Sequence, residues 1–420
     1  MDTKIFKGDI LFPENEFRTK QYDNSYVVVK NGLVEGIHPE LPEKYKNLPV
    51  EDYSGCLIIP AFSDLHLHAA QFYQRGVGMD KLLLDWLQDY TFPQESRFRE
   101  EEYARTAYDL FAKEMIKHGT LQASIFTTVH YDASDYLFQA LESKGVSAFV
   151  GKVNMDANCP DYIREKTEHS LTETERFIAE HQGGKTVKPI LTPRFIPTCT
   201  EELMRGLGKL AKKYHAPVQT HLCESIGEIE CVRSLFPQYK CDAEVYLNTG
   251  LIGDNLSILA HCIYLSPEDL SIVLGNNCVA VHCPDSNMNV IAGIMPASKL
   301  LNNGVKIAMG CDIGGGHDLP VYKVMASSIQ VSKLRELYLK DCSSITIEQA
   351  FHMATKAGGS CFGNIGTFDK GYQFNALVID DSMIPGFKLS PVQRLERFCY
   401  IGDDRNIRER FIRGEKVDFE

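Results

Sequence analysis

The sequence predicts an α/β fold, a (β/α)8 barrel of the TIM type, with a small β-sandwich-like domain formed from both chain ends. Two observations predict the barrel: short apolar or β-branched runs alternate with segments of helical period, and eight such runs occur. Apolar runs with little polar alternation are typical of parallel strands that are covered on both faces. Eight strand–helix units favour a closed barrel over an open sheet.

The predicted strands follow one another along most of the chain. They lie at residues 57–68, 121–130, 146–154, 187–195, 217–224, 256–264, 278–286 and 305–313. Segments of helical period between them include Glu101–Lys117, Glu201–Tyr214, Pro267–Leu274 and Pro296–Leu301. The connection between the first two strands is long, so we expect it to carry extra helices, including residues 82–90.

Both chain ends read as short strands joined by turns. Asn31-Gly32 is a hairpin signal, and residues 374–381 and 410–417 supply further strand signals. We therefore expect residues 1–56 and 370–420 to form one composite β-domain beside a barrel of residues 57–369.

Composition excludes several classes of protein. The 420 residues are 44% hydrophobic and 24% charged, with a net charge of −12. An acidic surface repels phosphate backbones and argues against a nucleic-acid partner. The opening residues lack an apolar signal segment and no apolar run is long enough for a membrane span, which predicts a cytoplasmic protein. Thirteen cysteines without a C-x-x-C pair are expected to stay reduced and to pack as small hydrophobic residues.

Metal-binding and acidic side chains stand at the ends of several predicted strands. The first strand ends in His66-x-His68, the fifth in His221 with Glu224, the sixth in His261 and the eighth in Asp312. Strand ends of a barrel converge on one mouth, where the catalytic groups of this fold lie. Each histidine by itself is more often a packed residue than a ligand, but packing does not explain the joint pattern, since barrel interiors favour Val, Ile and Leu.

These residues predict one divalent metal ion per chain. His66 and His68 share a face of an extended strand, so one ion can receive both imidazoles. His221 and Asp312 would complete the protein ligands and leave a position for water, which is typical of catalytic metals. His130 and His282 also fall at strand ends; we expect His282 to shape the mouth and assign neither as a ligand.

Five motifs taken together resemble the amidohydrolase superfamily, in its deaminase branch with a single metal. They are PAFSDLHLHAAQ, THLCE, AHCIYLS, HCPDSN and GCDIGGG. DWLQDYTFP and LTPRF extend the resemblance towards those members that deaminate guanine. It runs from about residue 55 to about residue 330.

The resemblance implies a role for each site residue. It implies His66, His68, His221 and Asp312 as metal ligands, with zinc or ferrous iron as the ion. It makes Glu224 the proton shuttle and places His261 just outside the ligand set, facing the metal-bound water. The residues that would hold the purine are Gln71, Arg194, Phe195, His221 and Glu224. It also implies a homodimer.

The expected reaction is the hydrolysis of guanine to xanthine and ammonia by a metal-bound hydroxide. A divalent metal lowers the pKa of water from 15.7 towards ~7. Asp312 can accept a proton from that water, His261 can orient it, and Glu224 can return a proton to the ring and the leaving amine. The guanidinium fork of Arg194 matches the O6/N7 edge of guanine, and Gln71 can both donate and accept.

Two other interpretations stay open at this point. A related aminohydrolase could act on another purine, a pterin or a triazine with the same metal site. A catalytically inactive barrel used for assembly is the non-enzyme alternative, although such proteins typically lose ligands and this chain keeps the whole set. Metal content separates the inactive barrel from both enzymes.

Overall fold

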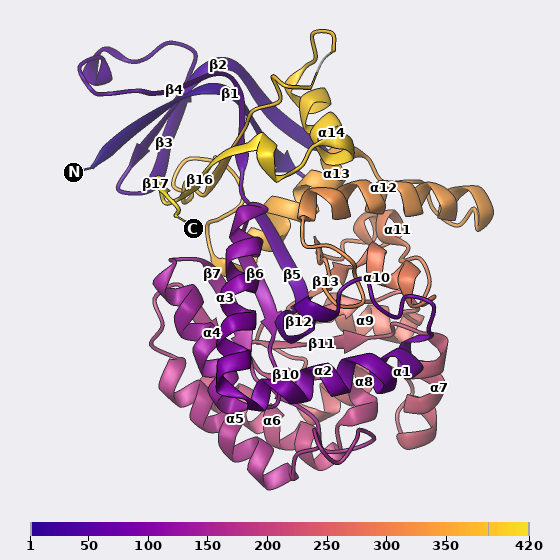
Figure 1. Cartoon of the computed structure of the whole chain (residues 1–420). Helices are drawn as coiled ribbons and strands as arrows, with labels where there is room; N and C mark the ends of the chain where they lie inside the picture. The colour runs from indigo at the N-terminus through magenta and orange to yellow at the C-terminus, as the bar shows by residue number, and fades with distance from the viewer. Residues whose placement is uncertain (1, 385, 419–420) are drawn as a thin grey trace.

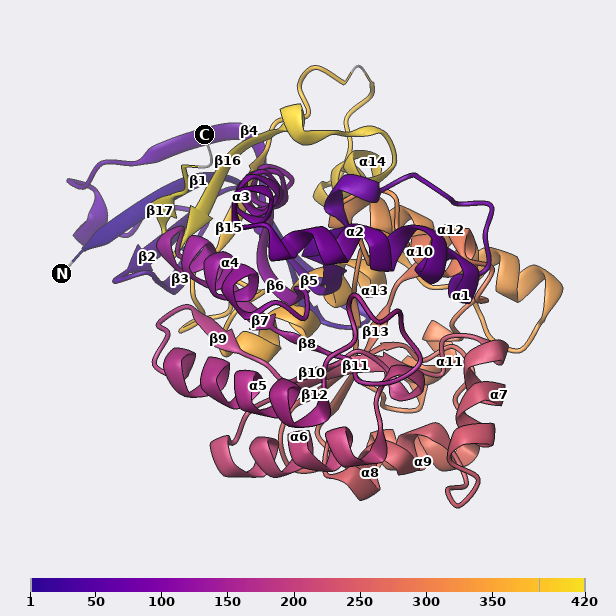
Figure 2. The same ribbon diagram turned by 60° about the horizontal axis from the view of Figure 1, so that its bottom comes forward.

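The computed structural model describes residues 2–384 and 386–418, and its larger part is a barrel of parallel strands surrounded by helices (Figure 1). Figure 2 shows helices covering the outside of these strands from a second direction. In chain order the barrel strands are β5 Phe62–His68, β6 Thr120–Phe126, β7 Ser147–Gly151, β8 Val153–Asn154, β9 Val187–Pro189, β10 Thr192–Pro193, β11 Val218–Leu222, β12 Ser257–His261, β13 Cys278–His282 and β14 Ile307–Met309. The predicted barrel is confirmed.

Backbone hydrogen bonds close the barrel at two seams. The strands form two parallel four-stranded sheets, β5-β6-β7-β9 and β11-β12-β13-β14, while β8 pairs with β10. At the first seam the Leu191 N–H donates to the Pro217 carbonyl (3.0 Å), and the Gln219 N–H donates to the Leu191 carbonyl (2.9 Å). At the second, the Asp312 N–H donates to the His66 carbonyl (2.8 Å). The second seam therefore joins two predicted metal ligands directly.

Helices lie between the strands and along the outside of the barrel. They are α1 Leu83–Trp86, α2 Phe92–Ser96, α3 Glu101–Lys117, α4 Tyr131–Ser143, α5 Thr167–His181, α6 Glu201–Tyr214, α7 Ile226–Leu235, α8 Asp242–Thr249, α9 Pro267–Gly275, α10 Pro284–Asn289, α11 Ala297–Asn302, α12 Val321–Tyr338, α13 Ile347–His352 and α14 Pro391–Ile401. Short 3-10 turns cover Glu43–Tyr45, Ala69–Gln74, Arg97–Arg99, Ile196–Thr198, Ser360–Phe362 and Asp404–Asn406, and π-helical turns cover Leu87–Thr91 and Met353–Ala357.

Capping residues explain why some helices begin where the sequence predicts. Ser266 precedes α9 and forms a capping box, in which its Oγ accepts from the Asp269 N–H and the Asp269 carboxylate accepts in return. Pro267 then occupies the first helical position, where its missing N–H is tolerated. Thr200 caps α6 with its side chain alone: its Oγ1 accepts from the Leu203 N–H (3.2 Å). The four predicted helices agree with α3, α6, α9 and α11 to within a residue or two.

Strands from both chain ends form a second sheet, at the upper left of Figure 1. Within the described residues this sheet has seven strands, in the order β17-β16-β15-β4-β1-β2-β3. The strands are β1 Thr3–Asn15, β2 Arg18–Lys30, β3 Leu33–His38, β4 Glu51–Pro60, β15 Ala376–Ile379, β16 Ile407–Ile412 and β17 Glu415–Lys416. It has its own core, built on Phe6, Phe374 and Phe411.

Two details of the small sheet bear on the sequence predictions. Asn31 (φ +52°) and Gly32 (φ +80°) turn the chain between β2 and β3, as the hairpin signal predicted. The predicted strand 57–68 is in fact two strands: β4 ends at Pro60 in the small sheet, and β5 begins at Phe62 in the barrel. Periodicity missed the change because both strands are buried there. The predicted domain boundaries themselves stay a prediction.

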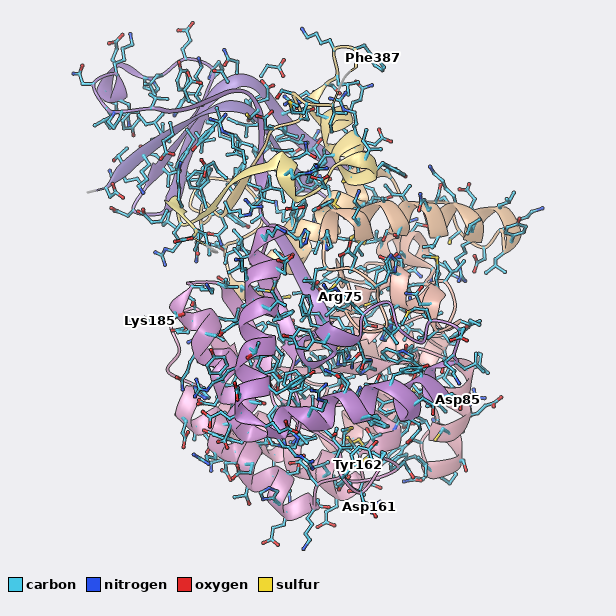
Figure 3. All side chains as sticks on the ribbon, in the orientation of Figure 1. Arg75, Asp85, Asp161, Tyr162, Lys185 and Phe387 are labelled. Carbon is cyan, nitrogen blue, oxygen red and sulfur yellow. The ribbon has the colours of Figure 1, made fainter. Side chains whose placement is uncertain are left out.

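The connection between β5 and β6 carries the extra helical turns that were expected. The 3-10 turn Ala69–Gln74, α1, the π turn Leu87–Thr91 and α2 follow one another along it. Trp86, Leu87 and Phe92 are buried on its inner side, whereas Asp85 is exposed on α1 (Figure 3). Because its apolar side faces the barrel, this connection can supply one wall of a pocket at the mouth.

The sequence predicts neither a membrane span nor disulfides. No helix among the described residues has the length and apolar character to cross a bilayer. The thirteen cysteines are unpaired in the described part of the chain, and Cys262 and Cys278 are buried as predicted.

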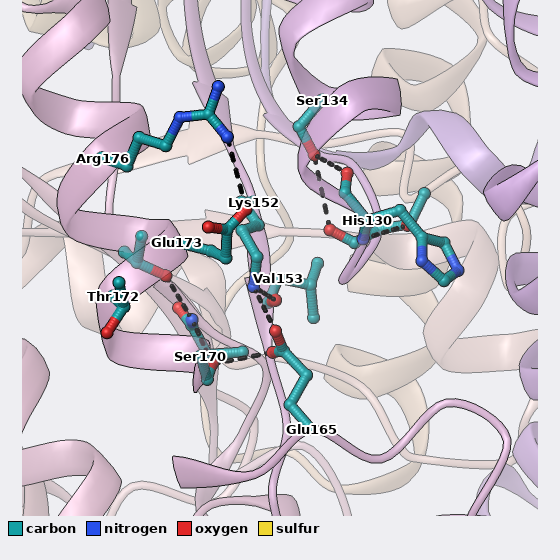
Figure 4. Close-up of polar contacts among 12 residues, drawn as sticks. His130, Ser134, Lys152, Val153, Glu165, Ser170, Thr172, Glu173 and Arg176 are labelled. Carbon is teal, nitrogen blue, oxygen red and sulfur yellow. Dashed lines mark hydrogen bonds and ion pairs between the residues drawn. The ribbon is translucent and has the colours of Figure 1, made fainter. Parts of the chain in front are cut away.

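One buried ion pair ties the third barrel unit together (Figure 4). Lys152, between β7 and β8, pairs with Glu165 (Nζ–Oε1 2.6 Å), and the two side chains are only 1% and 6% exposed. Ser170 donates to the other Glu165 oxygen (2.7 Å). Because both charges lie away from water, the pair stabilises the fold only while both partners are present.

Replacing Lys152 by methionine is therefore expected to destabilise the protein by about 3–5 kcal/mol, because the Glu165 carboxylate is left buried without its cation. Urea unfolding followed by far-UV circular dichroism measures the loss. The double variant Lys152→Met, Glu165→Gln removes both charges and is the matched control, expected to recover much of the stability. Equal losses in the single and double variants would contradict the charge explanation.

Candidate active site

The four predicted metal ligands lie together at the mouth of the barrel. His66 and His68 come from the end of β5, His221 from β11, and Asp312 from the segment that follows β14. Asp312 Oδ1 lies 3.2 Å from His66 Nε2 and 3.6 Å from His68 Nε2. His68 Nε2 and His221 Nε2 are 3.2 Å apart. All four side chains are buried. The structure thus brings together residues that are widely separated in the sequence.

Unusual backbone angles position two of the site residues. His261 (φ +73°) and Asp312 (φ +48°) both adopt left-handed conformations, which are uncommon for residues other than glycine. Such conformations persist where the surrounding structure fixes them and are frequent at functional sites. Asp64, buried on β5, supports this region because its carboxylate accepts from the N–H groups of His66 (3.2 Å) and Cys311 (3.1 Å).

The donor groups fit a divalent metal ion. Two groups of side chains have donor atoms within 4.8 Å of one another: His66 with His221 and His261, and His66 with His68 and Asp312. Among the described residues, Nε2 of His66 and Nε2 of His261 are buried without a hydrogen-bond partner. Imidazole nitrogens combined with a carboxylate oxygen suit zinc or ferrous iron.

Hydrogen bonds and burial prepare these side chains to ligate. The His221 Nδ1–H donates to the Arg194 carbonyl (2.6 Å), which leaves the lone pair on Nε2 facing the cluster. Burial lowers the pKa of His66, His68 and His221 well below the ordinary value, so the imidazoles are neutral. Burial also raises the pKa of Asp312 to about 6. A cation would offset the cost of burying the carboxylate, and a metal binds imidazole in its neutral form, so one ion would suit both kinds of side chain.

Glu224 and His261 lie beside the four predicted ligands and line the same pocket. His261 Nε2 is 3.6 Å from Glu224 Oε2 and 3.9 Å from Asp312 Oδ2. The His261 Nδ1–H donates to Asn287 Oδ1 (2.9 Å), which holds the ring in place. Burial, with a smaller contribution from Asp312, raises the pKa of Glu224 well above its ordinary value. A carboxyl group held in this manner is suited to carry a proton.

A pocket opens beside this cluster. It combines apolar walls with a few convergent polar groups, which is typical of a small-molecule site. It is lined by His68, Gln71, Leu83, Trp86, Leu87, Arg194, Phe195, His221, Glu224, His261, Ser286, Val290, Asp312 and Gly315. The predicted purine-binding residues therefore all line the same pocket as Glu224 and Asp312.

Comparison with known proteins identifies the family. The sequence pattern of the amidohydrolase family matches residues 57–417. The chain belongs to the amidohydrolase family. A guanine deaminase of Dictyostelium discoideum is 33% identical to this chain, and the match covers 99% of this chain and 98% of that protein. A guanine deaminase of Mus musculus is 38% identical, and the match covers 86% of this chain and 82% of that protein. The crystal structure of guanine deaminase from C. acetobutylicum with bound guanine is 44% identical, with a TM-score of 0.97 and coverage of 99% of this chain and 100% of that one. The resemblance inferred from the motifs is confirmed.

Other strand-end histidines of this amidohydrolase do not join the cluster. His130, labelled in Figure 4, follows β6 and precedes α4. It lines a separate surface groove together with residues of α3 and α5. His282 ends β13 and is buried, but within the described residues it is not among those lining the active-site pocket. The expectation that His282 shapes the mouth stays a prediction.

Sequence reasoning missed several residues of the pocket. Leu83, Trp86 and Leu87 come from the β5–β6 connection, and Val290 follows α10. Glu95 does not line the pocket but contacts two residues that do. No local signal marked these positions as functional, because an amphipathic helical turn reads as ordinary core packing.

Proposed function

We propose that this amidohydrolase is a guanine deaminase, which hydrolyses guanine to xanthine and ammonia. The observation that carries the proposal is one pocket in which Arg194 and Gln71, a proton-carrying Glu224 and a metal-type donor set all converge. The 44% identity over the full chain to an enzyme with guanine in its active site supports the choice of substrate.

The pocket residues suit the edges of guanine. Arg194, 2% exposed, carries a guanidinium that can donate to the O6 and N7 acceptors. Adenine presents an amine where guanine has O6, so Arg194 discriminates against it. Phe195 (4% exposed) contributes an apolar wall, with its ring centroid 6.1 Å from that of His221. These contacts orient the ring over Glu224.

Glu224 moves the protons of the reaction. The amino group of guanine is a poor leaving group as an anion and must depart as ammonia. Glu224 takes a proton from the attacking water and delivers it to a ring nitrogen as the new C–O bond forms at C2. It then takes the proton of the new C2 hydroxyl and delivers it to the amino group, which leaves as ammonia while the C2 carbonyl forms. This role is worth about 10²–10⁴-fold in rate. His261, fixed by Asn287, orients the water. A metal held by His66, His68, His221 and Asp312 would supply the charge that makes water nucleophilic at neutral pH.

Three finer assignments accompany this proposal. We propose zinc as the metal, with ferrous iron as the other ion that the donor set accepts. We further propose a homodimer and a cytoplasmic location. Metal analysis of the purified protein and its mass in solution test the first two.

Wild-type protein loaded with zinc is expected to convert guanine to xanthine with release of ammonia. The loss of guanine absorbance and an enzyme-coupled ammonia assay measure the two products independently. Adenine, a pterin and an aminotriazine serve as comparison substrates. Adenine is expected to react at least about 10³-fold more slowly, because the buried Arg194 donors meet its amine in place of a carbonyl. Faster turnover of any of these would overturn the assignment of guanine while keeping a deaminase.

A further inference from the structure

We propose that Glu95 is a positioning residue that sets the ligand preference of the pocket. It fixes the amide of Gln71 and compensates the charge of Arg194, so that the pocket accepts neutral heterocycles and disfavours anions. The proposal rests on the proposed function, since it takes the pocket to be a purine site. It adds a selectivity residue outside the pocket wall.

Glu95 contacts two polar residues that line the pocket, Gln71 and Arg194. Its Oε1 accepts from Gln71 Nε2 (2.8 Å), and its Oε2 pairs with Arg194 Nη1 (2.7 Å). The side chain of Glu95 is 0% exposed and that of Arg194 3%. Gln71 lies 24 residues away in the sequence and Arg194 lies 99 residues away. One buried carboxylate thus receives a hydrogen bond from each of them.

The carboxylate determines which way the Gln71 amide points. An ionised carboxylate only accepts hydrogen bonds, so Gln71 must turn its NH2 group to Glu95. Its Oε1 is then buried without a partner among the described residues. Gly314 (φ +118°) permits this arrangement, since a Cβ there would lie 1.9 Å from Gln71 Oε1. Gln71 therefore offers the pocket an acceptor, and a ligand needs an N–H to satisfy it.

The same carboxylate compensates the positive charge of Arg194 beside the bound molecule. Arg194 is buried over the Phe92 ring (5.3 Å from its centroid), and Phe92 lies on α2 together with Glu95. A buried guanidinium without a counter-charge would attract an anion. With Glu95 alongside, Arg194 still donates hydrogen bonds, but the pair has no net charge. The pocket then prefers a neutral ring that carries a carbonyl and an N–H, as guanine does.

Elements outside the barrel strands hold this arrangement. Glu95 belongs to α2, on the connection between β5 and β6. Gln74 Nε2 donates to Thr91 Oγ1 (2.9 Å), which ties the turn that carries Gln71 to the segment before α2. Trp86 and Leu87 of the same connection line the pocket. This connection therefore contributes both the apolar wall and the charge compensation.

The test uses four variants of the full, metal-loaded chain. Glu95→Gln removes the compensating charge, Arg194→Gln removes the cation, and the double variant removes both. Glu100→Gln is the matched control, because Glu100 is exposed near α2 and its loss changes the net charge of the chain equally. The ligands are hypoxanthine, which is neutral at pH 7, and urate, which is an anion. Calorimetric titration gives the affinity of each variant for both.

The measured quantity is the ratio of urate affinity to hypoxanthine affinity. It is expected to rise about 10-fold or more in Glu95→Gln and to fall about 10-fold or more in Arg194→Gln. In the double variant it should return to within a few-fold of wild type, and Glu100→Gln should leave it unchanged. A purely structural role for Glu95 would weaken both ligands alike. An unchanged ratio in Glu95→Gln, or shifts of the same sign in both single variants, would overturn the proposal.

Two further readouts complete the test. Guanine KM should rise about 10-fold or more in Glu95→Gln while kcat changes less, because Glu95 does not contact the reacting atoms. If Glu95→Gln does not fold, the other two variants test the proposal: the ratio of urate affinity to hypoxanthine affinity should fall in Arg194→Gln and recover in the double variant. Failure of wild-type protein to turn over guanine would instead count against the proposed function, and is read separately from the affinity ratio.

Discussion

Replacing Glu224 by glutamine is expected to lower kcat for guanine by about 10²–10⁴-fold, with a much smaller change in guanine binding. Glutamine keeps the size and polarity of the side chain but cannot take a proton from water and pass it on. Glu224 is 3% exposed and lies beside His261, so bulk solvent cannot replace it as the proton carrier.

Steady-state kinetics of the Glu224→Gln variant, combined with its metal content, measure this effect. Metal content should stay at the wild-type level, because Glu224 is outside the proposed ligand set. Glu230→Gln is the matched control: Glu230 lies on the exposed side of the following helix, α7, and its loss should leave kcat unchanged. A Glu224→Gln variant with wild-type kcat would remove Glu224 from the proton relay.

Replacing His66 by alanine is expected to abolish stoichiometric metal binding and to lower activity by at least about 10³-fold. His66 belongs to both groups of metal-type donors, so its loss leaves each of them incomplete. Loss of one ligand weakens binding of the ion that would activate water, and without that ion the reaction has no strong nucleophile at neutral pH. Elemental analysis after dialysis against a weak chelator measures the metal directly.

His130→Ala is the matched control for this prediction. His130 is also a histidine placed just after a barrel strand, but it faces a different groove. Its replacement should leave metal content and activity unchanged. Chelator-treated wild-type protein should lose activity and regain it with added zinc, which separates loss of metal from misfolding of the His66→Ala variant. Full metal retention by that variant would contradict the ligand set.

The sequence determined the barrel and the proposed ligands. The eight apolar runs correspond to the barrel strands because burial on both faces leaves a local, readable pattern. His66, His68, His221 and Asp312 could be selected because each stands at the end of such a run, and barrel topology sends all those ends to one mouth. The hairpin at Asn31-Gly32 was equally local, since its positive φ angles restrict the residues that fit.

Only the tertiary structure decided how the pocket is completed. Glu95 reads in the sequence as a residue of a polar helical turn, yet it is fully buried between Gln71 and Arg194. The division of residues 57–68 into β4 and β5 depends on which sheet supplies the hydrogen bonds. The residues of both strands are apolar there, so the sequence pattern does not show the change. The left-handed backbone at Asp312 follows from closing β14 against β5.

The physical reason is the range of the interactions. Periodicity, capping and turn chemistry act between neighbouring residues, so they leave a trace in the sequence that can be read directly. Closure of the barrel and placement of the β5–β6 connection depend on packing between distant segments. The role of a buried carboxylate depends on the hydrogen-bond and charge partners that this packing brings to it. The chain itself therefore specified the chemistry of the proposed metal ligands, whereas the folded structure determined the charge and orientation of the groups proposed to select the bound molecule.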